Sequence, residues 1–180
     1  MTLELYADCS RCEAICCVAL AFDASAEFAV DKAAGEHCRH LTATNRCRIH
    51  SRLPDRGFSG CAKYDCYGAS QRATALVRQA TFDDPSVRTR TLAETFARLV
   101  ALGELLLLLR EAGRLELGTE SETERTRLQS ELESLDTLER IACVDVERYE
   151  RTVHQFLRGM ESIAREHVRL RRMARVLPVR

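Results

Sequence analysis

The sequence predicts a mainly α-helical protein, in which a small irregular cysteine-rich module precedes an antiparallel bundle of about three helices. Eight of the nine cysteines lie before residue 67, whereas apolar residues beyond residue 90 recur at steps of three and four. Helix-breaking residues are sparse beyond Pro85. We therefore divide the chain into a cysteine-rich module over residues 1–85 and a helical bundle over residues 86–180, with the boundary near residues 80–87.

The cysteine-rich module is predicted to consist of short elements. Residues 13–22 favour a short helical turn, Gly35 indicates a loop, and residues 54–68 are rich in turn-forming residues. Little of this region is periodic in its apolar residues. We expect its order to come from something other than long helices.

The first helix of the predicted bundle follows Pro85. Its apolar stripe widens into a fully buried face at the leucine run, and Gly113 and Gly118 mark its end and the following turn. We interpret this stripe as bundle core. Its members are Leu92, Phe96, Leu99, Leu102, Leu105 and Leu109.

Two more helices are predicted beyond this turn. The second should start near residues 119–121, where acidic residues suit the helix dipole. A single helix over residues 121–176 would be about 85 Å long, which is too long for a compact domain of this size. We therefore expect a break between Ser134 and Asp145, with a helix start at Asp136 and Glu139. Two stripes support these helices: Leu128, Leu132, Leu135 and Leu138, then Val146, Tyr149, Val153, Phe156, Met160, Ile163, His167 and Leu170.

Charge is balanced over the whole chain but separated along its C-terminal half. The 180 residues carry a formal net charge of zero, which gives no overall attraction to nucleic acid or membrane. Residues 111–150 contain twelve acidic and five basic residues, and residues 151–180 contain eight basic and two acidic residues. We expect these opposite charges to face one another within the bundle, so the partner expected for the helical half is a protein and not nucleic acid. The basic cluster comprises Arg165, Arg169, Arg171, Arg172 and Arg175.

No segment indicates a membrane or secretory protein. The longest apolar stretch, Leu99–Leu109, is well short of the roughly 20 residues that span a bilayer, and Glu104 interrupts it. The first eight residues lack the basic and apolar regions of a signal peptide. We expect a cytoplasmic protein, whose thiols are kept reduced.

The cysteine spacing is typical of metal ligands. The pattern is C-x2-C-x3-C-C-x20-C-x8-C-x13-C-x4-C, and thiols separated by two to four residues can converge on one tetrahedral ion. The adjacent Cys16 and Cys17 diverge, so they serve two different centres or one of them is not a ligand. The candidate ligands for zinc or an iron–sulfur cluster are Cys9, Cys12, Cys16, Cys17, Cys38, Cys47, Cys61 and Cys66.

Three chemistries compete for these thiols. Disulfides fit poorly with the odd total of nine cysteines and the adjacent pair. Structural metal fits best, because about 70 residues with few large apolar side chains cannot bury enough surface to fold unaided. The third chemistry is redox or catalytic, with Cys9, Cys12 and Cys16 holding three irons of a cubane cluster. Their spacing, however, reverses that of radical S-adenosylmethionine enzymes.

Other candidate ligands are weaker. His50, three residues after Cys47, has ligand-like spacing, and a ligand role for His37 or His40 beside Cys38 is weaker still. Cys143 stands alone in a helical segment, where we expect it to be a buried apolar residue outside the site.

Four segments together resemble known proteins: residues 9–17, 35–41, 46–50 and 57–68. They are similar to the cysteine-rich N-terminal region of certain bacterial pentapeptide-repeat proteins and, more loosely, to the CxxCxxxCC family of zinc- or iron-chelating domains. The resemblance covers about residues 5–72 closely, and a helical segment like residues 88–175 follows in the first group. It implies that the eight clustered cysteines chelate metal.

The resemblance implies metal binding more firmly than any reaction. No A-(D/N)-L-x-x pentapeptide repeat follows the helical segment within residues 1–180, so the role of those repeats does not carry over. The CxxCxxxCC family includes a flagellin lysine methylase besides proteins without known activity. We expect a metal-binding cysteine-cluster protein that acts as an interaction or regulatory module. The alternative is an iron–sulfur redox or methyl-transfer enzyme, although the sequence contains no paired carboxylates, Ser-His-Asp arrangement or phosphate-binding glycine loop that would assign a catalytic residue.

Overall fold

The protein is mainly α-helical, as the sequence predicts. A computed structural model of the chain describes residues 3–160 and residue 165. Within these residues, strand pairing is confined to two isolated bridges, Phe22 with Lys32 and Leu41 with Cys47. The helices are α1 (Cys16–Ala19), η1 (His50–Arg52), η2 (Pro54–Arg56), α2 (Ser59–Lys63), α3 (Ala69–Gln79), α4 (Pro85–Ala112), α5 (Thr119–Glu133), α6 (Leu138–Cys143) and α7 (Val146–Gly159).

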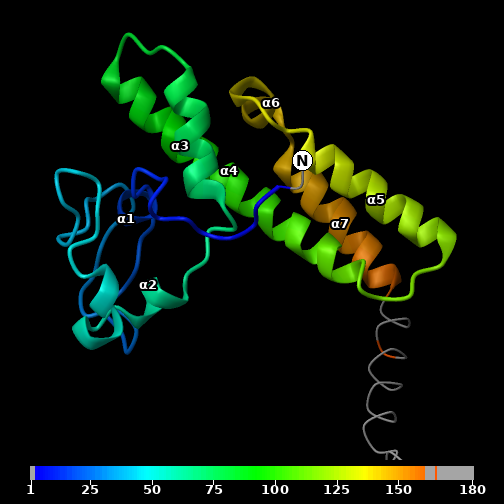
Figure 1. Ribbon diagram of the computed structural model, residues 1–180, viewed down its shortest axis with the longest axis horizontal. Helices are drawn as coiled ribbons and strands as arrows, with labels where there is room; N and C mark the ends of the chain where they lie inside the picture. Colours follow the sequence, from blue (N-terminus) through cyan, green and yellow to red (C-terminus); the bar gives the residue numbers. More distant parts are fainter. Residues whose placement is uncertain (1–2, 161–164, 166–180) are drawn as a thin grey trace, which may run out of the picture.

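The long helix α4 is the centre of the fold (Figure 1). It begins where Asp84 accepts a hydrogen bond from the Ser86 backbone N–H at 2.7 Å, with Pro85 in its first turn. The helices α3, α5, α6 and α7 all pack against it. None of the helices in the described ranges, α4 included, has the length and apolarity needed to cross a membrane. The buried apolar side chains of α4 include Leu106 and all six members of the predicted stripe: Leu92, Phe96, Leu99, Leu102, Leu105 and Leu109.

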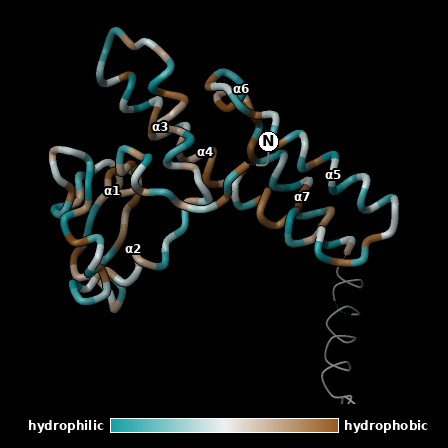
Figure 2. Tube along the Cα trace, viewed as in Figure 1, coloured by the Kyte–Doolittle hydropathy of each residue, from teal (hydrophilic) through white to brown (hydrophobic). Residues whose placement is uncertain are grey.

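The predicted break after the second bundle helix is confirmed. The helix α5 begins at Thr119 and ends at Glu133, and the chain then forms the short α6 before α7 begins at Val146. Figure 1 shows α5 running back along α4 and α7 running back along α5. Hydrophobic residues recur between hydrophilic ones along these helices (Figure 2), and Leu128, Leu132 and Val153 are fully or almost fully buried.

The helix start predicted at Asp136 is wrong by one residue. Thr137 caps α6, because its hydroxyl accepts a hydrogen bond from the Arg140 backbone N–H at 3.3 Å. Asp145 caps α7 in the same way, with Arg148 as donor at 2.9 Å. The last three residues of the predicted stripe, Ile163, His167 and Leu170, lie outside the described residues.

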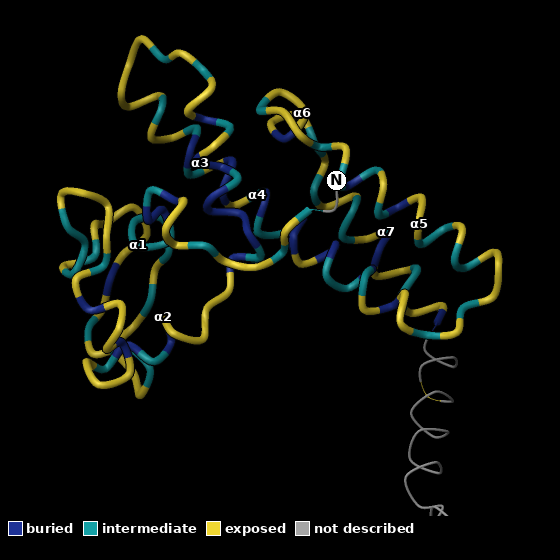
Figure 3. The backbone as a smooth tube through the Cα atoms, viewed as in Figure 1, coloured by how far each residue is buried: buried dark blue, intermediate teal, exposed yellow. Residues whose placement is uncertain are grey.

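The helix α3 was not predicted from the sequence. Ala69, Ala73 and Val77 recur at steps of four and are buried against α4, but two of the three are too small to give a strong apolar signal. Figure 3 shows buried residues concentrated where α3 meets α4. The main hydrophobic core therefore includes residues on both sides of the predicted boundary at residue 85, from Ile15 to Val153. The division into two domains stays a prediction.

The cysteine-rich region has a second, much smaller core. Ile49, Leu53 and Phe58 are buried there. The rings of Phe22 and Phe28 stack beside them, with centroids 4.4 Å apart. A Cβ atom on Gly60 would lie 2.2 Å from the Phe28 ring, so only glycine permits this packing.

Several charged side chains of α4 and α5 form ion pairs. On α5, Arg125 pairs with Glu122 at 2.6 Å and Arg127 pairs with Glu124 at 2.7 Å. Arg110 of α4 pairs with Glu133 of α5 at 2.9 Å. Four members of the predicted basic cluster lie outside the described residues, so its pairing with the acidic helices stays a prediction: Arg169, Arg171, Arg172 and Arg175.

Candidate metal centre

All eight predicted ligands line one cavity of about 840 Å³ in the cysteine-rich region. They reach it from the loop before α1, from α1, from two loops around the Leu41–Cys47 bridge, from α2 and from the turn before α3. Cys143 does not line the cavity and is exposed, so the prediction that it is buried is wrong. The structure thus brings together every cysteine that the spacing singled out: Cys9, Cys12, Cys16, Cys17, Cys38, Cys47, Cys61 and Cys66.

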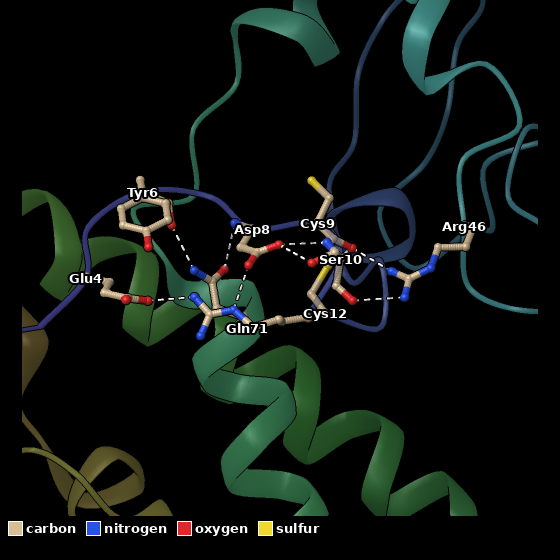
Figure 4. A network of polar contacts seen from close by, with 9 residues as sticks. Glu4, Tyr6, Asp8, Cys9, Ser10, Cys12, Arg46 and Gln71 are labelled. Atoms are coloured by element: carbon tan, nitrogen blue, oxygen red, sulfur yellow. Dashed lines mark hydrogen bonds and ion pairs between the residues drawn. The ribbon is translucent and has the colours of Figure 1, made fainter.

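The N-terminal wall of the cavity is tied to α3 (Figure 4). Gln71 accepts a hydrogen bond from the Asp8 backbone N–H at 3.2 Å and donates one to the Tyr6 carbonyl at 2.8 Å. Arg46 donates to the Cys9 carbonyl at 2.6 Å and to that of Ser10 at 2.9 Å. These bonds hold the Cys9–Cys12 turn against the rest of the cavity.

The bend between Cys12 and Cys16 is anchored to two helices by Glu13. Its carboxylate accepts from Arg78 of α3 at 2.9 Å and from Arg88 of α4 at 2.8 Å. Ala14 adopts a left-handed conformation (φ 52°). This bend turns the Ala14 backbone N–H toward the Cys12 sulfur, which accepts it at 3.4 Å. A sulfur that accepts a backbone N–H is stabilised in its thiolate form.

The opposite wall is built by backbone pairing between distant cysteines. The Cys38 backbone N–H donates to the Cys17 carbonyl at 3.0 Å. The bridge between Leu41 and Cys47 then returns the chain, so that Cys47 comes back toward Cys38. Cys61 on α2 completes this wall. The backbone N–H of the preceding residue, Gly60, donates to the carbonyl of Glu27, which lies between the bridge partners Phe22 and Lys32.

A buried lysine lies beside this wall, and the sequence reasoning missed it. Lys32 is 6% exposed, and its Nζ donates to the carbonyls of Val18 at 3.1 Å, Leu20 at 2.5 Å and Ala33 at 3.0 Å. The ammonium also lies 5.7 Å from the centroid of the Phe22 ring. One signal could have found it, since Lys32 and Lys63 are the only lysines in an arginine-rich chain.

Burial and mutual proximity shift the acidity of the thiols. Burial raises the pKa of Cys12 and Cys47, and it raises that of Cys61 to about 11. A hydrogen bond from the Cys16 thiol lowers the pKa of Cys17 to about 7 and raises that of Cys16. Without metal, most of these shifted thiols are therefore protonated at neutral pH, and a metal ion must displace their protons.

Eight thiols are a donor set that fits zinc or an iron–sulfur cluster. They line one cavity, but they do not converge on a single point. All nine cysteines are free. In the described part of the chain, no three His, Cys, Asp or Glu side chains are grouped closely enough to hold a metal ion as they stand. Convergence on one ion therefore requires the thiols to move from the positions that they have in this structure.

The histidines differ in their relation to the cavity. His40 and His50 line it, and His37 does not. The His40 ring packs edge-on against Phe58, with centroids 5.0 Å apart, which gives it a packing role in the small core. The ligand role of His50 stays a prediction.

Comparison with known proteins gives one curated relative. An uncharacterized protein of Bacillus subtilis (strain 168), YybG, is 32% identical over 169 residues, which cover 92% of this chain. The match covers 61% of that protein's length, so the chain corresponds to part of it. The sequence matches no protein-family profile. No solved structure matches it.

Proposed function

We propose that the protein is a metal-binding cysteine-cluster protein, in which thiolates of the cavity hold zinc or an iron–sulfur cluster in the cytoplasm. The observation that carries this proposal is the gathering of all eight clustered cysteines around one cavity, from parts of the chain up to 57 positions apart. The ninth cysteine, which the spacing excluded, is outside it. The resemblance to metal-chelating cysteine-rich regions supports the same conclusion.

Two features favour metal over other uses of these thiols. All eight are free, although several lie close enough to influence one another electrostatically. The small core within the surrounding region has only three buried residues, Ile49, Leu53 and Phe58. A metal held by thiolates would crosslink the loops that carry them and supply the folding energy that this core lacks.

The helical half suits an interaction or regulatory role. Its helices form a packed scaffold on which the cysteine-rich region is anchored through Glu13 and Gln71. We propose that a protein partner binds the exposed charged side chains of α5 or α7, such as Arg127 and Arg151. We assign no catalytic residue.

Metal analysis of the full chain tests the proposal. Protein purified anaerobically under reducing conditions should contain zinc, or else iron with inorganic sulfide and broad visible absorption. Colourless protein that contains zinc supports a structural metal-binding module. An iron–sulfur spectrum would instead support the alternative function, a redox or methyl-transfer enzyme. The Cys12→Ser variant should lose metal, and the matched control Cys143→Ser should keep it. Protein without either metal, made in cells supplied with both, would overturn the proposal.

A further inference from the structure

We propose that the cavity holds two metal centres with four thiolates each, and that the adjacent cysteines of α1 divide between them. This inference rests on the proposed metal binding and specifies its ligands. The first centre uses Cys9, Cys12, Cys16 and Cys66. The second centre uses Cys17, Cys38, Cys47 and Cys61.

The number of thiols fits two centres better than one. A structural zinc ion takes four ligands, and a [4Fe–4S] cluster likewise takes four cysteines. A single centre would leave half of the thiols in the cavity without a metal. The volume of about 840 Å³ leaves room for two centres side by side.

The pair Cys16 and Cys17 marks the border between the centres. Both belong to the helix α1, on which successive side chains point about 100° apart. Two such side chains aim at different points, so they suit neighbouring ions better than the same ion. Because the two residues are neighbours on this helix, the two centres would lie next to each other.

The first four thiols lie around the Cys9–Cys12 turn. The Cys12 sulfur is held between the Cys9 carbonyl, 3.7 Å away, and the Ala14 backbone N–H. Cys66 lies in the turn before α3, lines the same cavity and is 3% exposed. The thiols that act on Cys12 electrostatically are those of Cys9 and Cys66.

The second four thiols lie around the pairing of Cys17 with Cys38. The bond between their backbones and the bridge at Cys47 bring three of these cysteines together. Cys61 completes the set from α2. The thiols that act on Cys61 electrostatically are those of Cys17, Cys38 and Cys47, which are its proposed partners.

Each proposed centre has its own cation nearby, and the first also has a backbone donor, because the Ala14 N–H donates to the Cys12 sulfur. Arg46 binds the Cys9–Cys12 turn of the first, and the buried Lys32 binds the carbonyls that follow Cys17 in the second. Four thiolates around a divalent ion leave a net negative charge, which a nearby cation stabilises.

Cobalt titration of the full chain tests the number of centres. Protein stripped of its metal is titrated with Co²⁺ alone, whose thiolate charge-transfer absorption reports tetrahedral sites. The absorption should rise linearly and stop at two equivalents, with four thiolates per cobalt. An end point at one equivalent would overturn the division while leaving the proposed function intact. If Co²⁺ and Zn²⁺ both fail to bind and iron with sulfide forms no cluster either, the proposed function and the inference fall together.

Alkylation of variants saturated with Co²⁺ tests the ligand sets. In Cys12→Ser the thiols of Cys9, Cys16 and Cys66 should become reactive while the second set stays protected, and one cobalt equivalent should be lost. In Cys61→Ser the pattern should reverse. The Cys143→Ser control should keep both equivalents and full protection of the eight thiols. The division would be overturned if, in both variants, Cys16 and Cys17 are either both protected from alkylation or both reactive. If a variant does not fold, the cobalt titration of the wild type still tests the number of centres.

Discussion

The two regions of the molecule are ordered by different means. Along α4 and the helices packed on it, large side chains such as Phe96, Leu106 and Leu132 are 0–1% exposed and form one continuous core. The cysteine-rich region is mostly exposed or half-buried (Figure 3) and relies on side chains bonded to backbone carbonyls, such as those of Lys32 and Arg46. The first region can be stable through apolar burial, whereas the second needs crosslinks.

The difference also explains where conformational freedom should lie. Regions with few buried apolar contacts open with low free energy, whereas packed helices open only in global unfolding. A metal-dependent region joined to a metal-independent scaffold can change its order while the scaffold persists. Breaking each region separately therefore tests both the fold and the proposed function.

Metal removal should have the largest effect. A strong chelator should make backbone amides of residues 8–66 exchange quickly with solvent, because the proposed crosslinks are lost. Amides of α4, α5 and α7 should keep their protection, because only two of the eight ligands contribute to their core: Cys66 is part of it and Cys16 packs against it. Hydrogen exchange followed by mass spectrometry, with and without chelator, measures both regions at once. Unchanged protection in residues 8–66 of demonstrably metal-free protein would contradict the comparison.

A substitution that creates a cavity in the helical bundle should destabilise the bundle and leave the cysteine-rich region intact. Leu132 of α5 is fully buried, so Leu132→Ala should lower the free energy of unfolding by about 2–5 kcal/mol. Chemical denaturation followed by far-UV circular dichroism measures this loss, since the chain has no tryptophan for fluorescence. Metal content at neutral pH should not change, because Leu132 does not line the cavity. Loss of metal in a folded Leu132→Ala protein would show that the two regions are ordered together.

Glu13 connects the two regions and makes their junction sensitive to acid. Hydrogen bonds from Arg88 and Arg78 lower its pKa below the ordinary value of 4.5. A carboxylate whose folded pKa is lowered stabilises the protein above its unfolded pKa, and this contribution is lost as the pH falls through the folded value. Glu13→Gln should therefore lower the free energy of unfolding at pH 7 by about 1.5 kcal/mol and by less in acid.

Denaturation of both proteins across the acid range measures this difference. Metal content is measured for both proteins at each pH, so that metal released by acid is separated from the contribution of Glu13. A matched control is Glu111→Gln, whose ion pair with Arg114 lies on the exposed surface of α4 and should contribute little. An equal loss from both variants would show that Glu13 does not connect the regions.

The long helices could be predicted because each has a sufficient apolar period. The stripe from Leu92 to Leu109 and the length limit on residues 121–176 were enough to place α4, α5 and the break before α7. The helix α3 was missed because Ala69 and Ala73 bury little surface, although α4 covers them completely. Periodicity therefore finds helices that bury large side chains and misses those that fit closely with small ones.

The candidate site was predictable in its residues but not in its geometry. Spacing alone separated the eight cavity cysteines from Cys143. It could not show that Cys38 pairs with Cys17 or that Lys32 is buried beside them, because both depend on contacts between distant segments. The exposure of Cys143 was mispredicted for a related reason, since the six-residue α6 buries Ile141 and leaves its last residue at the surface.

The smallest expected effect concerns the start of α7, which only the structure defines. The Asp145 side chain accepts the Arg148 backbone N–H at 2.9 Å and lies where the helix dipole favours negative charge. Asp145→Ala should lower the free energy of unfolding by about 1 kcal/mol, whereas Asp145→Asn should lower it by less because the amide oxygen can still accept the bond. Both variants should bind metal as the wild type does, because this cap is far along the chain from every cavity residue. If Asp145→Ala and Asp145→Asn lower the free energy of unfolding equally, the effect is due to the charge and not to the cap. A change in the metal content of either variant would contradict the separation of the two regions.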